Sequence, residues 1–125
     1  RSHKRIGTAS ALAEVIYRSV PRMYRNARLD PATRTFQALR IAVNNELDSL
    51  AAVLPQALEL LADGGKLIAI SFHSLEDRIV KKFMRDVTIK GLVEPAIVRP
   101  LRPTRAEVMA NPRAASARLR WLIKL

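Results

Sequence analysis

Five polar side chains of the kinds that act in catalytic or metal sites lie within seven consecutive residues of this sequence. They are Ser71, His73, Ser74, Glu76 and Asp77. Serine, histidine and aspartate together could form a hydrolytic triad, but triad members rarely lie this close in sequence and no nucleophile elbow precedes them. A metal site is also poorly supported, because the chain has one other histidine, His3. Capping explains Ser74 and Asp77, whereas for His73 a functional and a structural role stay equally open.

The elements around this cluster predict where it lies in a fold. The apolar run from Lys66 to Phe72 predicts a short, buried parallel strand. Gly64 and Gly65, just before it, end a helix, and Ser74 is expected to cap the helix that follows. This alternation is typical of an α/β protein with a doubly wound sheet, in which ligands bind beyond the carboxyl ends of the strands.

Two helices are predicted before this strand. Thr8 can cap a short helix that Pro21 ends. A longer helix follows, because apolar residues recur at three- and four-residue spacing from Phe36 to Leu54. We expect Pro55 to kink this helix or to start a new one.

The region after residue 87 is predicted to contain two strands and a helix. One strand is placed near Ala96 to Arg99. Thr104 and Glu107 match a capping box, which opens a helix that ends before Asn111. Residues 118–125 alternate between apolar and basic side chains, which predicts a half-exposed strand with a basic outer face.

The net charge is +11, and it is concentrated at the two ends of the chain. Residues 1–35 contain eight basic and two acidic residues, and residues 91–125 contain seven and two. Residues 36–90 contain seven of each and are neutral. Such basic ends favour binding to the phosphates of a nucleic acid over a role in solubility alone.

Two groups of arginines could hold phosphate. Arg34 lies near a helix N-terminus, which attracts anions, although capping of that helix by Thr33 or Thr35 accounts for the same pattern. Arginines near the C-terminus could bind phosphate bidentately or form a solvated strand face. These are Arg113, Arg118 and Arg120.

Composition excludes several classes of protein. Hydrophobic residues make up 49% of the chain, which supports a packed core. There are no cysteines, which excludes disulfides and thiolate metal sites and is consistent with the cytoplasm. No apolar run approaches the roughly 20 residues that span a bilayer, and the basic start lacks the apolar segment of a signal peptide.

Three segments closely resemble the bacterial MraW/RsmH family. They are PATRTFQALRIAVN at 31–44, SFHSLEDRIVK at 71–81, and NPR at 111–113 together with SARLR at 116–120. Members of that family transfer a methyl group from S-adenosylmethionine to the N4 amine of a cytidine in small-subunit (16S) rRNA. The three motifs occur in the family's order, and the resemblance covers most of the chain except residues 87–101.

The resemblance implies a class I, Rossmann-like methyltransferase fold, of which this chain is the C-terminal portion. Residues 1–30 would be the end of an inserted helical domain, and residues 31–125 the C-terminal half of the catalytic domain. The family's glycine-rich cofactor loop has no counterpart, because none of the four glycines forms a G-x-G pattern after a strand. We therefore expect S-adenosylmethionine to bind the complete enzyme and not this chain alone.

The resemblance also implies roles for individual residues. Ser71, His73 and Ser74 would lie on the substrate side of the crevice and position a flipped cytidine. Methyl transfer would be direct and would depend on positioning, without a metal. The residues expected to contact rRNA phosphates are Arg34, Arg40, Arg78, Arg113, Arg118 and Arg120.

Two alternatives are not catalytic. The chain could be an RNA-binding module whose affinity depends on salt. It could instead be a structural fragment that self-associates through exposed sheet edges.

Overall fold

A computed structural model of the chain describes residues 5–21, 30–94 and 99–125. The chain divides into two compact units, residues 1–45 and 46–125, and each is described by itself below. The strand expected near Ala96 to Arg99 lies largely outside the described residues. No helix in the described part is long and apolar enough to cross a membrane.

The first unit contains helices α1 (Ala9–Ser19) and α3 (Pro31–Asn44). The prediction for α1 is confirmed: the Thr8 side chain caps the helix by accepting from the Ala11 N–H. Helix α3 is capped by Asp30, not by Thr33 or Thr35 as expected, because a proline at the first helical position leaves the preceding Asp30 as the cap. Asp30 also accepts a hydrogen bond from the Tyr17 hydroxyl, which lowers the pKa of the carboxyl.

The long helix predicted up to Pro55 is in fact interrupted at Asn45. Helix α3 ends at Asn44, and Asn45 takes a left-handed conformation (φ 51°) that asparagine tolerates better than most residues. A second helix, α4 (Glu46–Leu60), begins at the next residue and continues through Pro55. The prediction that Pro55 breaks the helix is therefore wrong, and the break lies ten residues earlier.

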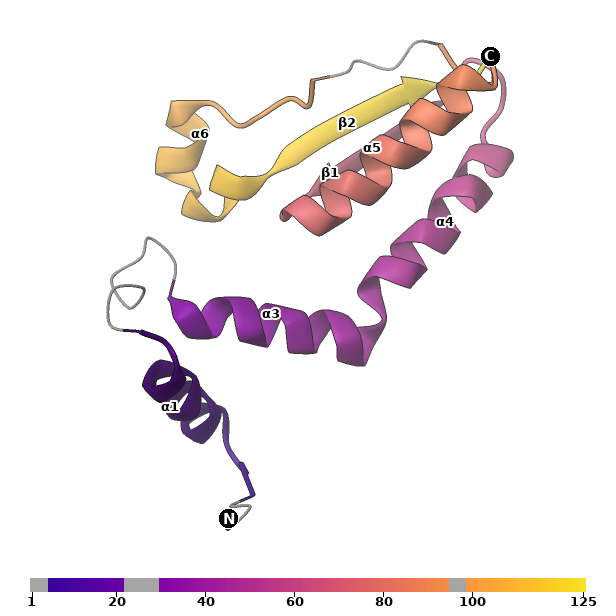
Figure 1. The fold of residues 1–125 in the computed structure, drawn as a ribbon. Helices are drawn as coiled ribbons and strands as arrows, with labels where there is room; N and C mark the ends of the chain where they lie inside the picture. The colour runs from indigo at the N-terminus through magenta and orange to yellow at the C-terminus, as the bar shows by residue number, and fades with distance from the viewer. Residues whose placement is uncertain (1–4, 22–29, 95–98) are drawn as a thin grey trace. The chain divides into compact units, whose positions relative to one another are not determined.

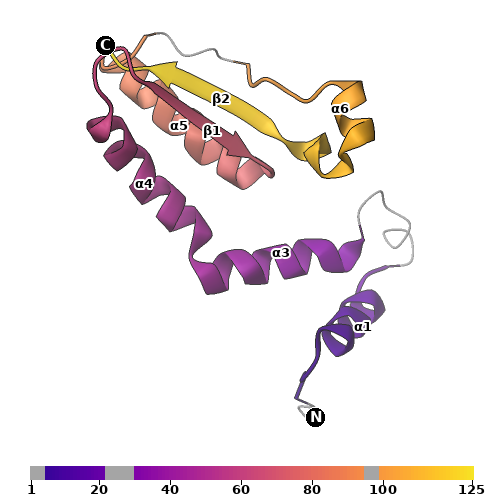
Figure 2. The same ribbon diagram turned by 180° about the vertical axis from the view of Figure 1, so that it is seen from behind.

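The second unit combines a small sheet with helices, which confirms the α/β class. Strand β1 (Lys66–Ser71) is followed by α5 (Ser74–Ile89), α6 (Arg105–Ala110), the 3₁₀ helix η1 (Pro112–Ser116) and β2 (Arg118–Ile123). In Figures 1 and 2, β1 and β2 lie side by side, and α5 runs along them. The capping box predicted at Thr104 is confirmed in part, because its side chain accepts from the Glu107 N–H.

The two strands are antiparallel, with Leu67 opposite Leu122 and Ile70 opposite Leu119. The prediction of a parallel strand after residue 65 is thus wrong for the only strand that β1 pairs with among the described residues. An apolar run carries no information about the direction of its neighbour, which here is set by the later return of the chain through α6.

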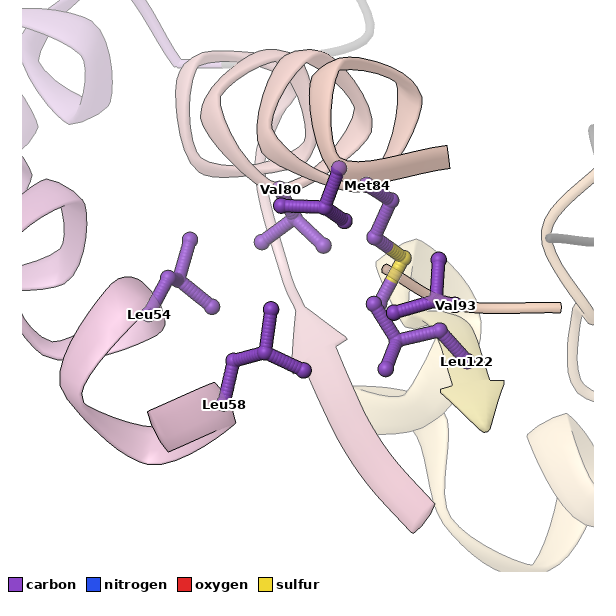
Figure 3. Close-up of a cluster of buried hydrophobic side chains, with 7 residues drawn as sticks. Leu54, Leu58, Val80, Met84, Val93 and Leu122 are labelled. Carbon is purple, nitrogen blue, oxygen red and sulfur yellow. The ribbon is translucent and has the colours of Figure 1, made fainter. Parts of the chain in front are cut away.

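The core of this unit lies on one face of the sheet. Leu54 and Leu58 of α4 meet Val80, Met84 and Val87 of α5, and together they cover Leu122 of β2, which is 1% exposed. Figure 3 shows side chains of both helices directed toward the sheet. The alternation of β1 follows from this packing, because Leu67 and Ala69 contact the core.

Candidate functional site

The polar cluster found in the sequence forms the turn between β1 and α5. Ser71 is the last residue of β1 and is 3% exposed, with its hydroxyl donating a long hydrogen bond to the Arg118 carbonyl (3.5 Å). Phe72 follows and leaves about half of its surface exposed, and Ser74 is exposed. The strand end therefore buries one of its two serines and presents an aromatic ring and the other serine to solvent.

His73, not Ser74, caps helix α5. Its Nδ1 accepts a hydrogen bond from the Glu76 N–H (3.2 Å), and Glu76 Oε2 accepts from the N–H groups of Phe72 (2.9 Å) and His73 (3.2 Å). These reciprocal bonds form a capping box with histidine in the place usually taken by serine or threonine. The expectation that Ser74 is the cap is wrong by one residue. A box-like spacing from His73 to Glu76 was the signal in the sequence that could have found it.

The cap also fixes the proton on the His73 ring. A neutral imidazole carries one N–H, so an Nδ1 atom that accepts a hydrogen bond leaves the proton on Nε2. This Nε2 atom is buried and has no hydrogen-bond partner among the described residues, although it lies 3.3 Å from Glu76 Oε1. The short distance without hydrogen-bond geometry indicates an electrostatic contact.

A carboxylate oxygen of Glu46, at the start of α4, also lies near this ring. Ligand atoms of Glu46, His73 and Glu76 all lie within 4.8 Å of one another, which is a possible metal-binding arrangement. The proton on Nε2 argues against it, because a metal would need the lone pair of that nitrogen. The arrangement suits a protonated donor facing two carboxylates, and the expectation that the chain binds no metal stays a prediction.

Asp77 fastens α5 to β2 instead of acting beside His73. Its Oδ1 accepts from Arg120 Nε (2.8 Å) and its Oδ2 accepts from Arg118 NH1 (2.8 Å). The hydrogen bond from Arg120, followed by that from Arg118, holds the pKa of the Asp77 carboxyl below its usual value despite the opposing effect of burial. Because Asp77 is paired with arginines and His73 with Glu76, the residues do not form a Ser-His-Asp relay.

The structure separates the six arginines expected to contact RNA into two kinds. Arg120 is 6% exposed and lies on the core-facing side of β2, so the prediction of a wholly basic outer face for this strand is wrong. Arg118 is partly buried by the same aspartate. The other four are exposed, at separate places in the fold: Arg34 and Arg40 in α3, Arg78 in the first turn of α5, and Arg113 in η1.

The sequence profile of the MraW methylase family matches residues 1–125. The chain belongs to this family. A "Ribosomal RNA small subunit methyltransferase H" of Synechococcus elongatus is 52% identical over 109 residues, which are 87% of this chain and 36% of the relative. Proteins of the same name from Sulfurihydrogenibium sp. and Coxiella burnetii are 45% and 46% identical, covering 96% and 100% of this chain.

These relatives are much longer than the chain. The matches cover 41% of the Sulfurihydrogenibium protein and 44% of the Coxiella protein. The chain therefore spans less than half the length of the curated relatives that it matches.

Proposed function

We propose that this chain is the C-terminal portion of an rRNA methyltransferase that transfers a methyl group from S-adenosylmethionine to N4 of a cytidine in 16S rRNA. The observation that carries the proposal is the match of all 125 residues to the MraW methylase family, supported by relatives named as small-subunit rRNA methyltransferases. The ribosomal substrate would place the activity in the cytoplasm.

In this proposal, residues 31–125 supply the later part of a class I methyltransferase sheet, and residues 1–30 are the end of an inserted helical domain. The β1–β2 pair with α5 on one face supports a partial sheet, because sheets of this fold carry helices on both faces. The carboxyl end of β1 is then the edge at which substrate binds.

Among the residues at that edge, Ser74 and the Phe72 ring are the groups that solvent can reach. His73 would act by fixing the turn, since its ring caps α5 and contacts Glu76. Ser71 would support the turn from below through its contact with Arg118. Exposed arginines would hold the rRNA backbone, a role that suits Arg78 and Arg113 better than the buried Arg120.

The described residues do not fit a site for S-adenosylmethionine. Strand β1 is followed by Phe72 and His73, without the glycines that let a phosphate or cofactor approach a strand end. Gly64 and Gly65 lie before the strand, where Gly65 packs against the Ala62 carbonyl at the end of α4. We therefore derive no chemical step at a cofactor in this chain, and we propose that it does not methylate RNA alone.

Calorimetry and a methyl-transfer assay test the proposal together. Titration of the chain with S-adenosylmethionine should give no micromolar binding, and micromolar binding would overturn the assignment of the cofactor site to another part. The full-length protein should methylate small ribosomal subunits that lack the modification, with the new methyl group located on cytidine N4 by mass spectrometry. Methylation of a different base or atom would overturn the proposed specificity.

A non-catalytic RNA-binding module is a second candidate, favoured by the net charge of +11. It predicts RNA affinity without cofactor that falls steeply as salt rises. Filter binding at two salt concentrations distinguishes it from a purely structural fragment, whose RNA affinity should be weak at both.

A further inference from the structure

The outer edge of β1 presents backbone groups that point away from β2. Leu119 exchanges both of its backbone hydrogen bonds with Leu101 (2.9 and 3.0 Å), so its N–H and C=O are directed away from β1. In an antiparallel pair, opposite residues both direct these groups inward or both outward, and the direction alternates along the strand. Ile70, opposite Leu119, and Ile68, two residues earlier, therefore direct their N–H and C=O groups to the free edge.

An apolar groove runs along this free edge. It has a volume of about 320 Å³ and is bounded by β1 on one side and by α4 on the other. From α4 it is lined by Leu50, Val53, Leu54 and Ala57. Val53 is 50% exposed, although this helix face is directed at a sheet.

The second face of β1 is apolar as well. Ile68 and Ile70 are 59% and 57% exposed, on the face opposite to the one that α5 covers. A strand with apolar side chains on both faces is typical of an interior position in an α/β sheet and not of an edge. Among the described residues, nothing pairs with the outer edge of β1.

We propose that an extended strand from the remaining part of the longer polypeptide, the part that this chain lacks relative to its relatives, pairs with the outer edge of β1 beneath α4. This inference rests on the proposed function, because it takes the chain to be one portion of a longer enzyme. The relatives contain more than half of their length outside the matched segment, which is enough for such a strand. Its backbone bonds to Ile68 and Ile70, and its side chains cover Val53.

A second copy of this chain does not fit the same edge. Symmetric pairing of two β1 strands about a two-fold axis perpendicular to the sheet keeps the helices of both copies on the same face. Each α4 would then lie over the β1 strand of the other copy, where α5 of that copy already packs. A strand whose facing side is bare meets no such obstacle. This geometry argues against the self-association through sheet edges that the sequence left open.

Co-expression tests the proposal with matched variants on one helix. The affinity-tagged chain is co-expressed with the part of the Synechococcus elongatus relative that lies outside the matched segment. The wild-type chain should recover this part in equal amount, with slowed hydrogen exchange at the Ile68 and Ile70 amides. Val53→Glu should lower recovery about tenfold or more, because the carboxylate would be buried in an apolar groove without a partner. Leu60→Glu, on the same helix but 88% exposed and outside the groove, should recover as much as wild type.

A second variant acts on the strand itself. Ile68→Pro removes one outward N–H without touching a bond to β2, so circular dichroism should still show a folded chain while recovery is lost. The proposal is overturned if the wild-type chain recovers nothing, if Val53→Glu and Ile68→Pro both recover as well as wild type, or if the chain alone is a dimer with protected Ile68 and Ile70 amides. Recovery without methylation of small subunits would leave this inference standing and count against the proposed function.

Discussion

Asp77 in α5 and Arg120 in β2 form a buried ion pair that joins the helix to the sheet. Arg120 Nε lies 2.8 Å from Asp77 Oδ1, and the two side chains are 7% and 9% exposed. A second arginine, Arg118, satisfies the other carboxylate oxygen. Because Asp77 lies one turn after the His73 cap, this pair holds the turn at the carboxyl end of β1 in place against β2.

Replacing Asp77 should destabilise the second unit strongly. Asp77→Asn leaves the buried Arg120 guanidinium without its counter-charge, and removing one partner of a buried pair costs about 3 kcal/mol or more. Urea unfolding followed by circular dichroism measures the loss. Asp86→Asn is the matched control on the same helix, because Asp86 is 43% exposed and its pair with Arg85 is a surface contact worth at most about 1 kcal/mol. Equal losses for the two variants would show that the Asp77 pair contributes no more than a surface contact.

The same aspartate gives the stability a dependence on acid pH. Its pKa is lowered in the folded chain, so its contribution is complete above the unfolded value of about 3.9 and is lost as pH falls through the lower folded value. The difference in unfolding free energy between wild type and Asp77→Asn should therefore shrink below about pH 4. A difference that stays constant from pH 6 to pH 3 would contradict this assignment.

Two substitutions at His73 separate capping from function. His73→Ala removes the acceptor for the Glu76 N–H and should cost about 1 kcal/mol, whereas His73→Asn supplies an oxygen acceptor and should restore the stability. In the full-length enzyme, a residue that acts only as a cap would also regain methylation with asparagine. Restored stability without restored methylation would assign the ring a role beyond the cap.

The sequence predicted the class of fold and the elements around the turn, because apolar periodicity and helix caps are local signals. Thr8 and Thr104 were found in this way, and β1 was placed to within one residue. The break at Asn45 was missed because asparagine is compatible with a helix, and only the backbone shows that it takes a left-handed conformation.

The partner of Arg120 could not be predicted, since Asp77 lies 43 residues away in sequence and no pattern links them. The alternation of residues 118–125 correctly gave a strand. Its basic face was assigned to solvent because arginine is usually exposed. Burial of one guanidinium depends on a carboxylate from a different element, and that pairing exists only in the folded chain.

Gly65 should not accept a side chain. A Cβ atom there would lie 2.7 Å from the Ala62 carbonyl oxygen, which also accepts the Gly65 N–H, so the turn into β1 would have to shift. We expect Gly65→Ala to lower the unfolding free energy by about 1–3 kcal/mol, the usual cost of overpacking. Gly7→Ala is the control, because no atom lies within 4 Å of its Cβ position and the change should be nearly neutral. A neutral Gly65→Ala would show that the turn shifts freely.

RNA affinity should depend on the exposed arginines and not on the buried one. Arg78→Gln and Arg113→Gln each remove an exposed charge without breaking a printed ion pair, so each should weaken binding to single-stranded RNA. If each arginine contacts one phosphate, each change should reduce the slope of log affinity against log salt by about 0.7. Filter binding across a salt series gives these slopes directly.

The control for this experiment is Lys90→Gln, which makes the same change of charge at the exposed C-terminal cap of α5, at the opposite end of the helix from Arg78. A general effect of net charge would lower the affinity equally for all three variants, because long-range attraction depends on total charge. Direct phosphate contacts would reduce the slope only for Arg78→Gln and Arg113→Gln. An unchanged slope in both arginine variants would remove these two residues from the proposed RNA-binding surface.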